Sequence, residues 1–144
     1  MFADFLKRLT DPAPAPLPDD DARLALTALL VRVARSDNDY SANERRRIQS
    51  IVDARYKLNQ SERDALLEGA ETLESEAPDT VRFTRAIKDA VPYDERRAVV
   101  EALWEVALAD GARAKEEDAL LRLVANLLGV TDMDSAQARQ RAGG

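Results

Sequence analysis

The chain has 144 residues, about the length of one domain, and it contains neither cysteine nor histidine. Disulfides, thiol catalysis and imidazole chemistry are therefore excluded, and a bound metal would need oxygen ligands. The net charge of −6 argues against generic nucleic-acid binding, and the scarcity of aromatic residues and the lack of a recognition helix argue against specific DNA recognition. The N-terminus is too short and too charged for a signal peptide, and no segment reaches the roughly 18 apolar residues of a membrane span, so we expect a cytoplasmic protein.

The N-terminal residues combine a short amphipathic helix with a proline-rich spacer. Apolar residues at helical spacing predict the helix over residues 1–10, namely Phe2, Phe5, Leu6 and Leu9. Residues 11–21 are the predicted linker, because alternating prolines cannot continue a helix. The helix either docks to a partner or a membrane surface, or folds back over the bundle. The pattern leaves both interpretations open.

The chain from residue 22 onward predicts a series of helices separated by turn signals. Ser41 and Glu44 form a capping box, Pro78 and Pro92 interrupt helices, and Gly129 ends one. The residues expected to face the core are Leu26, Leu29, Leu30, Val33, Ala34, Ile48, Ile51, Val52, Leu66, Ala70, Leu73, Phe83, Ile87, Val91, Val99, Ala102, Leu103, Val106, Ala107, Leu120, Leu121, Val124, Leu127 and Leu128.

No alternating run rich in β-branched residues occurs, so the predicted fold class is all-α, with six to eight helices in a compact bundle. We place the helical domain at residues 22–130. Residues 131–144 are polar and rich in alanine, which predicts a C-terminal tail with a short, fraying helix.

A shift of 73 positions superimposes the two halves of the domain. It aligns core residues and turn acids, namely Leu30 with Leu103, Val33 with Val106, Ala34 with Ala107, Asp37 with Asp110 and Glu44 with Glu117. The pattern predicts an internal repeat, in which two helix–turn–helix units are related by a pseudo-two-fold axis and bury their apolar stripes against each other.

The repeated segments, VARSDNDYSANE at 33–44 and VALADGARAKEE at 106–117, resemble the duplicated A-x-x-D-G-x-x-x-x-x-E signature of the TerB-like (tellurite-resistance TerB) family. The resemblance covers roughly residues 22–130. It implies an all-helical bacterial domain with internal pseudo-symmetry, associated with chemical and metal stress and with acidic clusters proposed to bind divalent cations. A related domain belongs to a membrane-anchored DnaJ-like co-chaperone, which implies a role as an interaction module. Asn38 replaces the signature glycine, and Ala114 replaces the capping serine.

Five acidic residues of the two turns are candidate ligands for Ca²⁺, Mg²⁺ or Mn²⁺, namely Asp37, Asp39, Glu44, Asp110 and Glu117. If the turns approach each other, their carboxylates repel, and a bound cation would remove that penalty. The alternative is structural, because helix first turns favour glutamate and turns favour aspartate without any metal. The pattern is not an EF-hand loop, since Ala42 and Ile48 occupy the positions that require glycine and glutamate.

The charges are also unevenly distributed along the chain. Residues 32–57 carry seven positive and four negative charges, whereas residues 62–79 carry one positive and seven negative charges. The basic stretch is either a patch for an acidic partner or anionic lipids, or a solvated surface with internal salt bridges. Trp104 lies beside the strongest apolar stripe and is expected to be an aromatic residue at the edge of the core.

Three functions follow from these observations. The first is a non-enzymatic TerB-like protein that binds protein partners under stress, with a divalent cation as a candidate cofactor. The second is a metal-free scaffold or adaptor whose N-terminal helix docks to a partner or membrane. The third, an enzyme, is disfavoured because the sequence has no nucleophile elbow and no cofactor motif.

Overall fold

A computed structural model describes residues 6–7, 19–35, 40–77, 79–108 and 115–143. This part of the chain contains helices and no strand, which confirms the predicted all-α class. Its helices are α2 (Asp19–Ala34), α3 (Ala42–Tyr56), α4 (Gln60–Glu76), α5 (Thr80–Ala90), α6 (Tyr93–Leu108), α7 (Lys115–Leu127) and α8 (Asp132–Arg141). None of them is long and apolar enough to cross a membrane.

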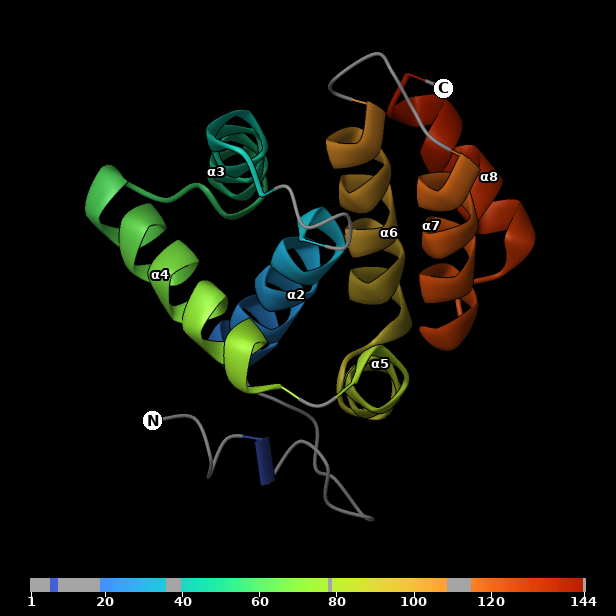
Figure 1. Cartoon of the computed structure of the whole chain (residues 1–144), viewed down its shortest axis with the longest axis horizontal. Helices are drawn as coiled ribbons and strands as arrows, with labels where there is room; N and C mark the ends of the chain where they lie inside the picture. The colour runs from blue at the N-terminus through green and yellow to red at the C-terminus, as the bar shows by residue number, and fades with distance from the viewer. Residues whose placement is uncertain (1–5, 8–18, 36–39, 78, 109–114, 144) are drawn as a thin grey trace.

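Helix α2 lies at the centre of the bundle and contacts α3, α4, α5 and α6. Figure 1 shows it between α4 on one side and α6 on the other. Its residues are buried around most of the helix, as expected for a helix that is apolar on nearly all sides. The buried members are Ala22, Ala25, Leu26, Thr27, Ala28, Leu29, Leu30, Val31 and Ala34. The Thr27 hydroxyl donates to the carbonyl of Arg23 at 2.7 Å, which satisfies the one polar side chain among them.

Helices α6, α7 and α8 pack together beside α2 (Figure 1). Trp104 of α6 is 2 % exposed, and its indole Nε1 donates to Ser135 Oγ of α8 at 3.3 Å. The indole is therefore a core residue. Because Ser135 and Ala138 are buried, α8 belongs to the packed bundle, which extends beyond the domain end expected at residue 130. At the other end, α2 begins at Asp19, within the segment expected to be linker.

The helix ends agree with the turn signals in the sequence. The capping box of Ser41 and Glu44 is present, and Asn59 with Glu62 forms a second box at the start of α4. Gly129 has a φ of +72°, and its N–H donates to the carbonyl of Asn126 at 3.0 Å. The Val130 N–H donates to the carbonyl of Ala125 at 2.9 Å, so α7 ends in a Schellman motif that needs a residue with positive φ.

The residues expected to face the core are all buried or partly buried. Of the two neighbouring leucines of α4, Leu67 is fully buried, whereas the expected Leu66 is only partly buried. Helices α2 and α3, shifted by 73 positions, cover 92–107 and 115–129, close to the bounds of α6 and α7. The internal repeat and its pseudo-two-fold axis stay a prediction.

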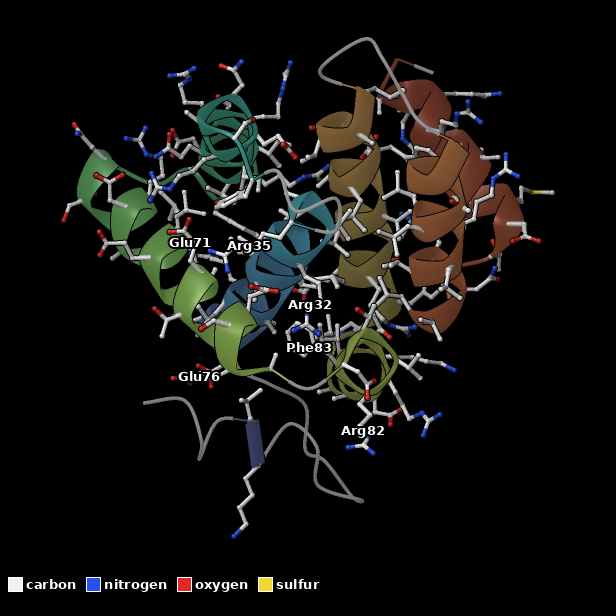
Figure 2. The ribbon with its side chains drawn as sticks, viewed as in Figure 1. Arg32, Arg35, Glu71, Glu76, Arg82 and Phe83 are labelled. Atoms are coloured by element: carbon white, nitrogen blue, oxygen red, sulfur yellow. The ribbon has the colours of Figure 1, made fainter. Side chains whose placement is uncertain are left out.

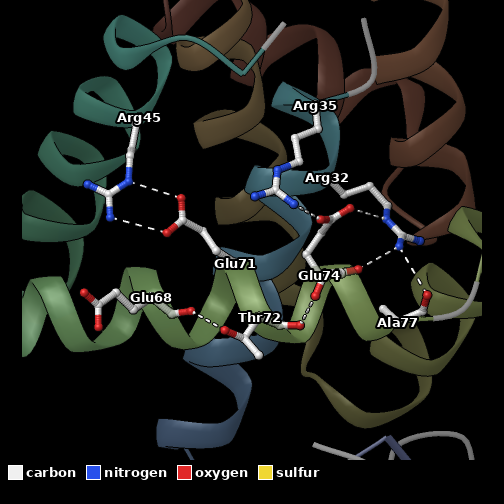
Figure 3. A network of polar contacts seen from close by, with 9 residues as sticks. Arg32, Arg35, Arg45, Glu68, Glu71, Thr72, Glu74 and Ala77 are labelled. Atoms are coloured by element: carbon white, nitrogen blue, oxygen red, sulfur yellow. Dashed lines mark hydrogen bonds and ion pairs between the residues drawn. The ribbon is translucent and has the colours of Figure 1, made fainter. Parts of the chain in front are cut away.

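A network of ion pairs joins α2 to α4 (Figure 3). Glu74 is buried, and its two carboxylate oxygens accept from Arg32 Nε at 3.2 Å and Arg35 Nη1 at 2.8 Å. Arg32 Nη2 also donates to the carbonyls of Glu74 and Ala77 at 3.1 and 3.3 Å. Two cations and several hydrogen bonds thus compensate the desolvation of a single carboxylate.

A second pair in the same region connects α3 to α4. Arg45 donates through Nε and Nη2 to the two oxygens of Glu71, at 3.1 and 3.3 Å (Figure 3). Arg35, whose side chain extends toward Glu71 and α4 in Figure 2, also lies over the ring of Tyr40, 5.0 Å from its centroid. Burial, together with the neighbouring Glu71 carboxylate, raises the pKa of Tyr40, so this residue is a neutral phenol that covers the edge of the core.

A third group of charges connects α3, α6 and α8 through Glu101. Its carboxylate accepts from Arg141 Nε at 2.7 Å and from Arg55 Nη2 at 3.4 Å. Burial alone would raise the pKa of Glu101, but the hydrogen bonds and charges of Arg141 and Arg55 outweigh this effect, and the net pKa is lowered from its ordinary value of 4.5.

We predict that Glu74→Gln lowers the free energy of unfolding by about 3 kcal/mol, the lower end of the range for a broken buried pair, because Arg35 is partly exposed to solvent. Chemical denaturation measures this change. Glu68→Gln on the same helix is the matched control, since Glu68 is exposed, and it should change stability by less than about 0.5 kcal/mol. Equal losses in the two variants would show that the network contributes nothing specific.

We also predict that the contribution of Glu101 to stability depends on pH. Because the pKa of Glu101 is lower in the folded state, the contribution is complete above about pH 4.5 and is lost as the pH falls toward the folded-state pKa. The difference in unfolding free energy between wild type and Glu101→Gln should therefore be constant near neutral pH and shrink below about pH 4.5. A difference that grows on acidification would contradict the assigned direction of the pKa shift.

Candidate functional site

The candidate site is an apolar cavity of about 340 Å³ between α2, α3 and α6. Its volume lies within the range of about 300–1,000 Å³ that is usual for binding pockets. Helical periodicity on the three helices turns their aliphatic side chains toward one another, and these side chains form its floor. The floor consists of Leu26, Leu30, Ile51, Val52, Val99 and Ala102, and Ala98 also lines the cavity.

The rim of the cavity is polar and aromatic, with Arg23, Arg55, Tyr56 and Glu95. The Arg23 guanidinium lies over the Tyr56 ring, 4.6 Å from its centroid. Burial raises the pKa of Tyr56, and the charges of Arg55 and Arg23 offset part of this rise, so the ring is a neutral surface on which the cation rests. Within the described part of the chain, Arg23 forms no ion pair.

Arg55 differs from Arg23, because its charge is already compensated. Its Nη2 lies 3.4 Å from carboxylate oxygens of both Glu101 and Glu105 on α6. These contacts connect α3 to α6 at the edge of the cavity. Arg23 is therefore the cation of the rim that can pair with an acidic group of a ligand, and it lies next to the apolar floor.

The predicted metal ligands lie mostly beyond what the structure describes. Asp37, Asp39 and Asp110 fall outside the described residues, and Glu117 lies in α7 with its side chain undescribed. The remaining candidate, Glu44, caps α3, with Oε1 3.4 Å from Ser41 N and 3.3 Å from Ser41 Oγ. The described residues contain no group of three acidic side chains placed to hold a metal ion. The five-carboxylate site thus stays a prediction, and one of its members has a structural role.

The uneven charge of the sequence is partly neutralised within the fold. Arg32, Arg35 and Arg45 of the basic stretch pair with Glu71 and Glu74 of the acidic stretch. This pairing supports the interpretation of the charges as internal salt bridges. Sequence reasoning did not identify the network, although one signal was present. Glu74 follows Leu67 and Ala70 at helical spacing, so it continues the buried stripe of α4.

The N-terminal helix is described only at Leu6 and Lys7. Leu6 is partly buried against the core, whereas Phe2, Phe5 and Leu9 lie outside the described residues. The two interpretations of this segment, a docking arm and a cover for the bundle, therefore both remain predictions.

Comparison with known proteins identifies the family. The family model described as "Tellurite resistance protein TerB" matches residues 23–140. No curated protein and no solved structure shows significant similarity to the chain. The match covers most of the chain, including α8, and agrees with the all-α fold. The chain therefore belongs to the TerB family.

Proposed function

We propose that the chain is a non-enzymatic binding module that recognises a partner protein through the cavity between α2, α3 and α6. The observation that carries the proposal is the apolar floor of this cavity beside Arg23, a cation without an ion pair in the described structure. These features fit an apolar side chain of the partner with an acidic residue next to it. The description of the family supports a role in bacterial chemical or metal stress.

The energetics suit such an anchor. Burial of one large apolar side chain contributes about 1.5–3 kcal/mol, and apolar anchors in desolvated pockets dominate the energy of many interfaces. The acidic residue of the partner would fix its orientation, because Arg23 is held over Tyr56 and loses little conformational freedom on pairing.

The alternative function is that of a metal-free scaffold or adaptor that docks to a partner or a membrane surface through its N-terminal helix. Deletion of residues 1–18 tests this alternative. Loss of partner or liposome binding without loss of stability would favour a docking role of the N-terminal helix.

We predict that Ala98→Phe weakens partner binding at least tenfold, because the new ring fills the cavity that the partner side chain would enter. Arg23→Gln should weaken it by a smaller factor, about threefold to tenfold, through loss of the charge. The matched control is Ala65→Phe, the same substitution at an exposed position of α4. Partners captured from the native cell should be identified, purified and titrated by calorimetry against each variant.

The outcomes of this experiment are distinct. A partner that binds the Ala65→Phe chain with wild-type affinity and the Ala98→Phe chain weakly supports the cavity. Equal binding to the two variants would place the interface elsewhere, and the absence of any specific partner would contradict the binding function itself. Thermal melting of each variant checks that the bundle stays folded.

The cation is the second part of the proposed function, and it rests on the acidic turns. If Asp37 and Asp110 are ligands, Ca²⁺ or Mn²⁺ should raise the melting temperature in proportion to the logarithm of its concentration. The double substitution Asp37→Asn with Asp110→Asn should abolish this rise, whereas Asp89→Asn on α5, an exposed acid elsewhere, should leave it unchanged. A rise of the same size in the double variant would rule out a site at the turns.

A further inference from the structure

A second groove, of about 570 Å³, lies on the opposite half of the bundle, between α7 and α8. Its floor includes Trp104 of α6, and its sides carry Arg122 and Asn126 from α7 and Arg139 and Gln140 from α8. The groove is thus polar, in contrast to the cavity between α2, α3 and α6. From its contents we propose that it binds a small organic carboxylate, independently of the partner-binding cavity.

Arg139 is the first reason for this assignment. Its guanidinium lies over the Trp104 ring, 5.2 Å from the centroid, so the aromatic ring holds the cation in place. The Nε atom of Arg139 is buried and has no hydrogen-bond acceptor. A buried donor without an acceptor costs about 1–3 kcal/mol. Because this atom is covered, a carboxylate in the groove would bind the terminal nitrogens of Arg139 and would reach Nε only if the side chain turned toward the groove.

The second reason is that neither arginine of the groove is neutralised. Arg139 is partly buried and forms no ion pair with any described residue, whereas most partly buried arginines of the described chain do, and the exposed Arg122 across the groove is unpaired as well. Arg55 is the informative comparison, because its Nε also lacks an acceptor while its Nη2 is paired with Glu101 and Glu105. The charge of Arg139 thus has no ion-pair partner among the described residues.

The third reason concerns the size and charge of the ligand. Asp132, in the first turn of α8, also lines the groove and opposes a negative ligand. With two cations and one carboxylate, the lining carries a net charge of about +1, which suits one carboxylate better than a phosphate dianion or a nucleic acid. The side-chain amides of Asn126 and Gln140 can hydrogen-bond to polar groups elsewhere on the ligand. A volume of this size is typical of a small-molecule site.

The experiment uses the full chain and its single tryptophan. Trp104 gives one indole N–H resonance, which reports on the groove floor because Nε1 donates to Ser135. Acetate, succinate, L-glutamate and inorganic phosphate are titrated at constant ionic strength, with NaCl as the reference, and calorimetry measures the same affinities. We expect at least one carboxylate to shift the indole resonance saturably and to bind more tightly than phosphate.

The variants separate the groove from the rest of the surface. Arg139→Gln should weaken carboxylate binding at least tenfold. Arg122→Gln, which leaves the contact of Arg139 with the indole intact, should weaken it about threefold or more. Arg47→Gln, the same change at an exposed arginine of α3, should leave the affinity unchanged. Thermal melting verifies that each variant is folded, and calorimetry is the deciding readout for Arg139→Gln, since its loss alters the environment of Trp104 directly.

Three results would overturn the proposal. They are the absence of any saturable shift beyond that of NaCl, unchanged affinity in folded Arg139→Gln, and binding of phosphate at least as tight as that of every carboxylate. None of these results bears on the cavity between α2, α3 and α6, whose test uses other residues and a protein ligand.

Discussion

Helix α2 is buried on nearly every side, and this burial determines where the charges at its C-terminal end must go. Arg32 and Arg35 follow a stretch of apolar residues that contact α3, α4, α5 and α6. The Arg32 side chain is mostly buried and that of Arg35 is only partly exposed, so a carboxylate placed where α4 crosses α2 compensates their charges. Glu74 supplies it, and the backbone carbonyls of Glu74 and Ala77, at the end of α4, accept two further hydrogen bonds from Arg32. A buried pair of this kind adds little net stability, but it leaves a large penalty for any arrangement that separates its members. It therefore specifies how α4 sits on α2.

The same central helix explains the cavity between α2, α3 and α6. Both α3 and α6 pack on α2, and the floor of the cavity is formed where their side chains do not fill the space between them. At its edge, α3 and α6 are connected by Arg55 with Glu101 and Glu105, long side chains that span a gap. The ion pairs of Arg55 thus bound the cavity on one side, and the packed apolar side chains of its floor bound it on the other.

The sequence allowed the fold to be predicted further than the site. Helical periodicity identified the core residues, because burial of one face repeats every 3.6 residues whatever the tertiary arrangement. Capping residues identified the ends of α3 and α7 for a similar local reason. The ion pair of Glu74 with Arg32 spans 42 positions, and periodicity does not say which helices cross. The cavity depends on packing imperfections between three helices, and no local pattern encodes these. In α4, periodicity predicted Leu66 as the buried residue, but its neighbour Leu67 is the one that is fully buried. Periodicity thus identifies the buried side of a helix without fixing its exact rotation about the axis.

The two halves of the chain correspond in their cores but differ on their surfaces. Leu30 and Leu103 are both buried at equivalent positions, as are Ile48 and Leu121. The rim of the cavity has no such equivalence, because the 73-residue shift places Arg55 and Tyr56 of the first half on Leu128 and Gly129 of the second. Conversely, Trp104, the floor of the groove between α7 and α8, corresponds to the much smaller Val31. The apolar cavity lies where α2 and α3 of the first half meet α6 of the second, whereas the polar groove is lined by α6, α7 and α8 of the second half alone. The proposed partner-binding cavity and the proposed carboxylate groove are therefore not equivalent sites of the two halves.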